Sequence, residues 1–167
     1  MPVDWLPPLL QFDGFWSAYV ERVFEIFERD FIKTSAKFRG LPIRLRFMPL
    51  HEGKPSAFWH LIQEGQIEEE RTPDIRRCER IGWLRAIIDK ADDPCLKIWE
   101  NERTGIRGVE RSVLLWLEDE RFLVILAKRN GYYLLLTAYP TNREHTCRKL
   151  RREYDDWVAQ KKAGPAF

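Results

Sequence analysis

The stretch "RFLVILAKRNGYYLLLTAY", residues 121–139, decides the fold of this 167-residue chain. Two runs of apolar, strand-forming residues flank Asn130-Gly131, and an Asn-Gly pair between such runs is typical of a two-residue type I′ β-hairpin. A turn of this kind pairs the flanking residues in order, as Lys128 with Tyr133, Leu126 with Leu135 and Val124 with Thr137. The stretch therefore predicts two antiparallel strands in a defined register.

Because side chains alternate along a strand, this register predicts which of them share a face. One face is expected to carry Phe122, Val124, Leu126, Lys128, Tyr133, Leu135, Thr137 and Tyr139. Thr137 and Tyr139 stand out, since their hydroxyls end an otherwise apolar strand away from the turn. The pair is either the rim of a core or half of a polar site. Lys128 shares the face but lies roughly 13 Å from the position opposite Thr137, which makes it a weaker site candidate.

Two more strand-like runs precede the hairpin, "CLKIWENE" and "RSVLLWLE", and short turns join all four. Earlier, "LPIRLRFMP" alternates Ile43, Leu45 and Phe47 with arginines, which predicts a half-buried strand. The segment "SAFWHLIQEG" fits either a strand or a helix. The order of elements predicts an α+β domain, with an antiparallel meander of four to five strands packed against N-terminal, middle and C-terminal helices.

Three helices are expected from periodicity and from capping signals. The first covers residues 15–32, with Asp13 as its cap. The second covers residues 72–90, with Thr72 as the cap and Pro73 at its first position. The third begins at about Arg143, where Thr141 and Glu144 fit a capping box. Residues 1–167 are expected to form a single domain, with residues 1–12 as an N-terminal extension.

Composition excludes several classes of protein. Cys78, Cys95 and Cys147 are scattered, which argues against a disulfide framework or a structural zinc site and favours buried thiols in a reducing compartment. The N-terminus lacks the pattern of a signal peptide, and no apolar run is long enough to span a membrane. A cytoplasmic protein without membrane association is therefore expected. The net charge of +2 is too small to identify a partner.

The second helix carries an unusual arginine pattern. Its C-terminal part has an apolar arc, and Arg76, Arg77 and Arg80 fall within the same arc one or two turns earlier, Arg77 nearest the middle. A buried, unpaired guanidinium is costly, so these side chains should meet carboxylates or face a cleft that binds an anion. Glu79 or the acidic run Glu68–Glu70 could supply the carboxylates.

Histidines complete the set of candidates. His60 is the one histidine within an apolar stretch, and it is either a hydrogen-bonded core residue or a general acid–base group. On the last helix, His145 shares a stripe with Arg148, Lys149 and Arg152. That stripe is either a solvated face or a surface that binds phosphates.

Several catalytic signatures are absent from the sequence. It contains no phosphate-binding glycine-rich loop, no GxSxG motif, no Cys–His pair and no acidic metal cluster, so no cofactor and no metal are expected. The remaining groups are histidine, threonine, tyrosine and arginine. These groups can position a phosphodiester and stabilise its transition state by acid–base and electrostatic catalysis.

The chain resembles the barnase–EndoU–colicin–RelE-like (BECR) nuclease domains, especially the branch associated with phages and plasmids. Three stretches carry the resemblance: "FWHLIQEG", "RTPDIRRCERIGWLR" and "YYLLLTAYPTNREHTCRKLRREY". With the order of elements, they span about Arg44 to Trp157. The resemblance implies an α+β fold that cradles RNA and a metal-independent cleavage of RNA, by attack of the 2′-hydroxyl on the adjacent phosphate. It also implies a toxin or effector that an inhibitor protein, or antitoxin, counters.

Carried over residue by residue, the resemblance implies a general base or acid at His60, phosphate-binding residues at Arg77 and Arg80, and substrate-orienting or transition-state groups at Thr137 and Tyr139. The basic residues expected to bind RNA around them are Arg76, Arg80, Lys128, His145, Arg148, Lys149 and Arg152. Two alternatives stay open. One is a non-catalytic RNA- or protein-binding module on the same fold. The other is an interaction protein of phage or plasmid origin, such as an inhibitor partner, for which the exposed-looking aromatic residues of "MPVDWLPPLLQF" offer a contact that could hold a homodimer together.

Overall fold

The computed structural model describes residues 3–65, 70–106 and 108–164 of the chain. Its centre is the predicted meander of four antiparallel strands. These are β5 (Lys97–Gly105), β6 (Gly108–Leu117), β7 (Phe122–Lys128) and β8 (Tyr133–Pro140). The α+β class and the meander are therefore confirmed.

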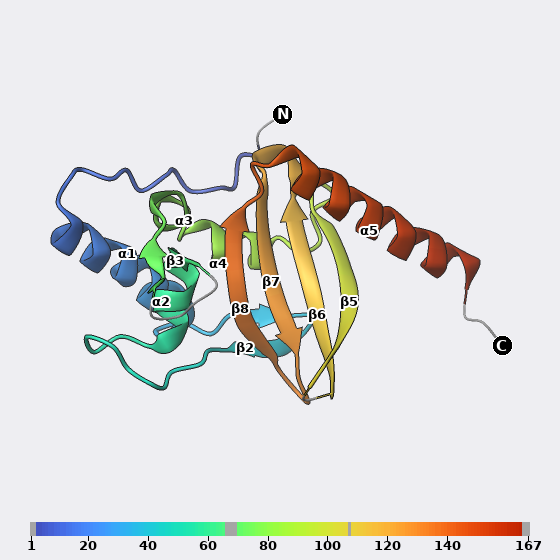
Figure 1. The fold of residues 1–167 in the computed structure, drawn as a ribbon, viewed down its shortest axis with the longest axis horizontal. Helices are drawn as coiled ribbons and strands as arrows, with labels where there is room; N and C mark the ends of the chain where they lie inside the picture. The colour runs from blue at the N-terminus through green and yellow to red at the C-terminus, as the bar shows by residue number, and fades with distance from the viewer. Residues whose placement is uncertain (1–2, 66–69, 107, 165–167) are drawn as a thin grey trace.

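Two short strands extend the sheet beyond β8, in the order β1-β2-β8-β7-β6-β5 (Figure 1). They are β1 (Lys37–Phe38) and β2 (Leu41–Arg44). β2 pairs with β8 in parallel, at Ile43 with Tyr133 and at Arg44 with Leu134. The strand predicted over residues 41–49 thus ends at Arg44, and Phe47 is exposed rather than half-buried. Past Leu134, helices rather than β2 lie against β8.

The described residues form five α-helices around the sheet: α1 (Trp16–Phe31), α2 (Ser56–Ile62), α3 (Ile75–Glu79), α4 (Trp83–Asp89) and α5 (Glu144–Ala163). The segment "SAFWHLIQEG", which fitted either a strand or a helix, forms α2 and then β3 (Gln63–Glu64). β3 pairs with β4 (Thr72–Pro73). The single helix predicted over residues 72–90 is wrong. The chain breaks between α3 and α4 at Gly82, which packs against Pro7 and Ile26.

Hydrophobic clusters cover both faces of the sheet. On one face, α1 to α4 pack over Val124, Leu126 and Leu135. On the other face, the N-terminal half of α5 packs Cys147 and Leu150 over Trp99 and Trp116. Figure 1 shows α1, α2 and α3 on the β8 side of the meander, while α5 runs past β5 and away from the sheet. Part of the α5 face of the sheet is therefore left without a helix over it.

A β-bulge changes the predicted hairpin register. Leu126 pairs with Leu135 as expected, but the next pair is Ile125 with Thr137, so Leu136 is an extra residue on β8. An extra residue reverses the alternation that follows it. Thr137 and Tyr139 therefore face α5, not the side of Tyr133 and Leu135. The prediction that these residues and Lys128 share one face is wrong.

The predicted caps are also wrong in detail. Asp13 accepts a hydrogen bond from the Phe15 backbone N–H at 3.1 Å, but Phe15 is the residue at the N-cap of α1. The cap of α3 is Asp74, which accepts from the Arg76 N–H, while Thr72 lies in β4. Thr141 is buried, where its hydroxyl accepts from the Trp116 indole at 3.1 Å. The side chain of Thr141 thus holds the β8–α5 junction and does not cap α5.

The N-terminal segment packs on the domain. Trp5 donates to Asp93 at 2.9 Å, and the Trp83 indole donates to the Pro7 carbonyl at 2.9 Å. The Tyr19 hydroxyl donates to the Leu10 carbonyl at 2.7 Å. Trp5 is therefore half-buried and hydrogen-bonded rather than exposed, while the homodimer stays a prediction.

All three cysteines are free, and the structure places them in two kinds of environment. Cys78 and Cys147 are buried, as predicted, but Cys95 is exposed, contrary to the prediction. Within the described ranges, no helix is long and apolar enough to cross a membrane.

Candidate functional site

Two hollows meet at Thr137. The first, named here the α2 hollow, lies between α2 and β8, has a volume of about 440 Å³ and includes Arg46, His60, Arg71, Leu136 and Thr137. The second, the α5 hollow, lies between the sheet and α5, has a volume of about 510 Å³ and includes Arg103, Leu136, Thr137, Tyr139, His145 and Lys149. Leu136 and Thr137 line both, so the two hollows are neighbours across β8.

His60 lies near the end of α2 and is exposed. α2 packs along β8, and this contact brings His60 to the same hollow as Thr137. The Arg71 guanidinium contacts the Nδ1 atom of His60. A guanidinium has only donors, so Nδ1 can take part in this contact only as an acceptor. The core alternative for His60 does not match its exposure.

Thr137 and Tyr139 line the α5 hollow because the bulge turns them to that face. Burial raises the pKa of the Tyr139 hydroxyl above its ordinary value, while the nearby cations Arg103 and Arg77 oppose this shift. The hydroxyl therefore stays protonated at neutral pH and can donate a hydrogen bond. Thr137 and Tyr139 are both half-buried.

Arg77 lies between α3 and the end of β8. Its guanidinium sits 5.6 Å from the centre of the Tyr139 ring, and Nη1 donates to the Gln63 carbonyl at 2.8 Å. Nε lies 3.4 Å from the Asp74 carboxylate, and the side chain is 15% exposed. Burial lowers the pKa of Arg77, and the charge of Asp74 opposes that shift. Asp74 is thus the carboxylate partner of Arg77 among the described residues, and Glu79 pairs with Arg80 instead.

Arg76 and Arg80 diverge from Arg77. Arg76 is exposed and lines a third hollow of about 440 Å³ with Arg77, Tyr139 and Arg143, here called the Arg77 hollow. Arg80 pairs with Glu79 at 3.6 Å and lies 5.1 Å from the Trp83 ring, which matches the carboxylate alternative. Two residues of the acidic run, Glu68 and Glu69, lie outside the described residues.

The basic residues predicted to bind RNA fall into two groups. His145 and Lys149 line the α5 hollow, whereas Arg148 and Arg152 are exposed on α5 and are not among its lining residues. Lys128 faces the opposite side of the sheet, where its amine lies 3.5 Å from the Glu100 carboxylate. Lys128 therefore cannot act with Thr137.

Sequence reasoning missed three arginines at these hollows. Arg103 on β5 lines the α5 hollow. The face of the sheet on which Arg103 lies follows from the β5–β6 register, and the short turn after Gly105 is the sequence signal for that register. Arg46 and Arg71 line the α2 hollow. No local pattern marks them, because their positions depend on how the segments around α2 pack against β8.

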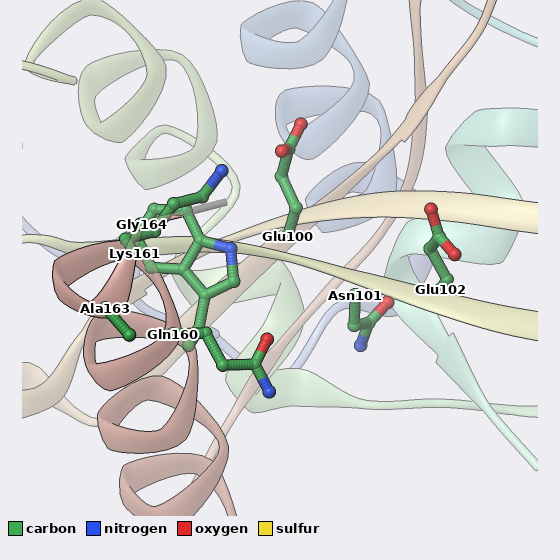
Figure 2. A pocket seen from close by; sticks show the side chains of 8 residues that line it. Glu100, Asn101, Glu102, Gln160, Lys161, Ala163 and Gly164 are labelled. Carbon is green, nitrogen blue, oxygen red and sulfur yellow. The ribbon is translucent and has the colours of Figure 1, made fainter. Parts of the chain in front are cut away.

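A larger hollow, of about 800 Å³, lies away from all of these residues, between β5 and the C-terminal part of α5. Figure 2 shows Glu100, Asn101 and Glu102 along the strand, and Gln160, Lys161 and Ala163 on the helix beside them. It contains none of the predicted site residues. Its two carboxylates already pair with cations, Glu100 with Lys128 at 3.5 Å and Glu102 with Arg111 at 2.9 Å.

Among the described residues, no group of three or more His, Cys, Asp or Glu side chains is arranged to hold a metal ion. Comparisons of the chain with protein families, with curated proteins and with solved structures find no match. Function is therefore inferred from the side chains of the site.

Proposed function

We propose that this protein is a metal-independent endoribonuclease whose site lies across β8. One observation carries the proposal: Thr137 lines the α2 hollow with His60 and also the α5 hollow with Tyr139, His145 and Lys149. An imidazole, two hydroxyls and cations thus border one continuous surface. These are the groups that a phosphodiester transfer needs when side chains supply the acid–base and electrostatic catalysis.

In the proposed reaction, His60 accepts the proton of an RNA 2′-hydroxyl. The 2′-oxygen forms a bond to the adjacent phosphorus, and the bond from phosphorus to the 5′-oxygen breaks. The leaving 5′-oxygen takes up a proton from solvent, so the products end in a 2′,3′-cyclic phosphate and a 5′-hydroxyl. Thr137 and Tyr139 act as hydrogen-bond donors to the phosphate oxygens as their negative charge grows.

The main role of Arg77 is to hold the Tyr139 ring in place, and it does not bind the phosphate directly. Its Nη1 and Nε atoms are engaged with Gln63 and Asp74, and its guanidinium packs on the Tyr139 ring. His145, Lys149 and Arg103, which line the α5 hollow, supply cations for the flanking RNA backbone. An inhibitor protein that covers β8 would block the same surface.

The test is cleavage of single-stranded RNA by the purified protein in excess chelator. We expect fragments with cyclic phosphate ends, and a loss of at least about a hundredfold in rate for His60→Ala, the usual size of a general acid–base contribution. Lys33→Ala is the control, because Lys33 pairs with Glu28 of α1 at 3.4 Å and lines none of these hollows. RNA that stays intact with wild-type protein contradicts the proposal.

The second candidate function is RNA binding without cleavage, and the exposed cations Arg148 and Arg152 favour it. Replacing both with alanine would then weaken RNA binding and reduce its dependence on salt concentration, by roughly one unit of slope per lost phosphate contact. In the nuclease reading the same double variant retains most of the cleavage rate at saturating RNA. Binding and rate measured on one RNA separate the two functions.

A further inference from the structure

The charges of the α2 hollow distinguish it from its neighbours. Arg46, His60 and Arg71 line it together with the hydroxyls of Ser56 and Thr137, and no carboxylate of the described residues is part of its lining. The α5 hollow includes Glu110 and Glu153, and the Arg77 hollow includes Glu64 and Asp74. Among the described residues, the lining of the α2 hollow is thus cationic, while the linings of the α5 hollow and the Arg77 hollow are mixed in charge.

Within the described ranges, no ion pair joins Arg46 or Arg71 to a carboxylate. The Nε atom of Arg71 is buried without a hydrogen-bond partner. Clustered guanidiniums repel one another, and an anion that accepts their hydrogen bonds relieves that repulsion.

The contact between Arg71 and His60 links anion binding to catalysis. Nδ1 of His60 accepts from the guanidinium, so its lone pair is not available to a substrate in this state. A phosphate oxygen is a stronger acceptor for a guanidinium than a neutral imidazole is. A phosphate in the hollow would therefore compete with Nδ1 of His60 for the Arg71 guanidinium.

We propose that the α2 hollow binds the scissile phosphate of RNA through Arg46 and Arg71, and that this phosphate displaces the Arg71 guanidinium from Nδ1 of His60, the proposed base. The inference rests on the nuclease function proposed above. It assigns the phosphate contact to Arg46 and Arg71, which the sequence analysis gave no role, and not to Arg77, whose guanidinium contacts Asp74 and Gln63. The hollow volume of about 440 Å³ suits a phosphate with part of its nucleotide.

The binding test does not depend on cleavage. The His60 ring signals are followed by NMR while inorganic phosphate is added, and separately while an RNA trinucleotide is added that lacks the reactive 2′-hydroxyl. We expect both to shift the signals, the trinucleotide at lower concentration. Arg46→Met and Arg71→Met should each weaken binding by about tenfold, the size expected for one charge-assisted hydrogen bond.

Three variants serve as controls. Arg44→Met removes a cation two residues from Arg46 whose guanidinium lies 4.6 Å from the Tyr132 ring, outside the hollow, so its phosphate affinity should equal that of wild type. Arg46→Lys and Arg71→Lys keep the charge, and each should restore most of the affinity that the methionine variants lose. Far-ultraviolet circular dichroism confirms that each variant is folded.

The outcomes separate this inference from the proposed function. RNA cleavage without any effect of phosphate or trinucleotide on His60 overturns the phosphate site and leaves the nuclease proposal standing. Methionine variants that bind phosphate as tightly as wild type also overturn it. Phosphate binding that needs both arginines, in a protein that leaves RNA intact, supports the site and overturns the nuclease function.

Discussion

Thr137 is the residue on which the candidate site depends, because it borders the hollow of His60 and the hollow of Tyr139. Its hydroxyl reaches this position only through the extra residue Leu136 in β8. In a regular hairpin the same side chain would point into the core under α1 to α4. A polar group there would need a buried partner.

Thr137→Val should separate the role of the hydroxyl from that of the side-chain volume. We expect the cleavage rate at saturating RNA to fall by about tenfold or more, because one transition-state donor is lost. The free energy of unfolding should change by less than about 1.5 kcal/mol, since the side chain is only half-buried. Thr104→Val, at an exposed position of β5, is the control and should cleave as wild type does. Equal rates for all three proteins would remove Thr137 from the mechanism.

Cys78 leads to a prediction about alkaline stability. Burial, with smaller contributions from Asp74 and Glu79, raises the pKa of this thiol to about 12, against about 9 for an exposed thiol. The folded protein thus keeps a proton that the unfolded chain loses, so stability is full below pH 9 and decreases as pH rises toward 12. The decrease for this one group is at most about 1.4 kcal/mol per pH unit. Urea unfolding of wild type and Cys78→Ala between pH 9 and 11 should show a shallower slope for the variant, and parallel curves would contradict this.

At the level of elements, strands were predictable and their faces were not. The turn at Asn130-Gly131 and the apolar runs define β7 and β8 within one or two residues. The bulge was not predictable, because β7 and β8 carry buried apolar residues on both faces. When both faces of a strand are apolar, a shift of one residue leaves apolar side chains on both faces, so the hydrophobic pattern does not define the register. The three consecutive leucines at residues 134–136 therefore give no sign of which one is the extra residue.

The bulge makes a specific prediction about a deletion. A chain with one leucine fewer among residues 134–136 can pair regularly, with Thr137 still opposite Ile125 and Tyr139 opposite Leu123. We therefore expect this variant to fold, with loss of the bulge and a modest decrease in melting temperature. Deleting Ala138 instead would turn Tyr139 into the core and bring the buried Thr141 out of register. That variant should be unfolded by circular dichroism, and equal stability of the two deletions would contradict the register.

The prediction of one helix over residues 72–90 was wrong because contacts between distant segments, which local sequence does not show, interrupt it. Periodicity places residues 72–90 on one continuous helix, but Thr72 and Pro73 pair with β3, and Gly82 lies against Pro7 where the chain turns. As a result Arg80 and Arg77 point to different neighbours, Glu79 and Tyr139. Distant segments, and not local preference, set this break.

For the molecule as a whole, the N-terminal segment is a structural part of the core. Half-buried Trp5, Leu6, Leu9 and Leu10 pack against the larger hydrophobic cluster, and Trp83 donates to Pro7. Removing residues 1–12 should lower the free energy of unfolding by roughly 3–5 kcal/mol, from the apolar surface exposed. Phe15→Ala, at a side chain that is 73% exposed, should change it by less than about 0.5 kcal/mol.

The measurement for this prediction is urea unfolding, with light scattering to record the mass of each protein. A truncated chain as stable as the full chain would show that the segment does not support the core. A mass that falls from dimer to monomer on truncation would instead return the segment to the role of a dimer contact.

Local sequence was sufficient for the class of the fold, the meander and its turns, since alternation, helical periodicity and an Asn-Gly pair act over a few residues. It also marked His60, Thr137 and Tyr139 as unusual polar residues. Tertiary contacts were needed for everything that joins them: the bulge that turns two hydroxyls toward α5, the packing of α2 on β8, and the approach of Arg46 and Arg71 to the same hollow. The physical reason is that local pattern encodes burial and backbone geometry, whereas a site is made where segments distant in the chain happen to be packed side by side.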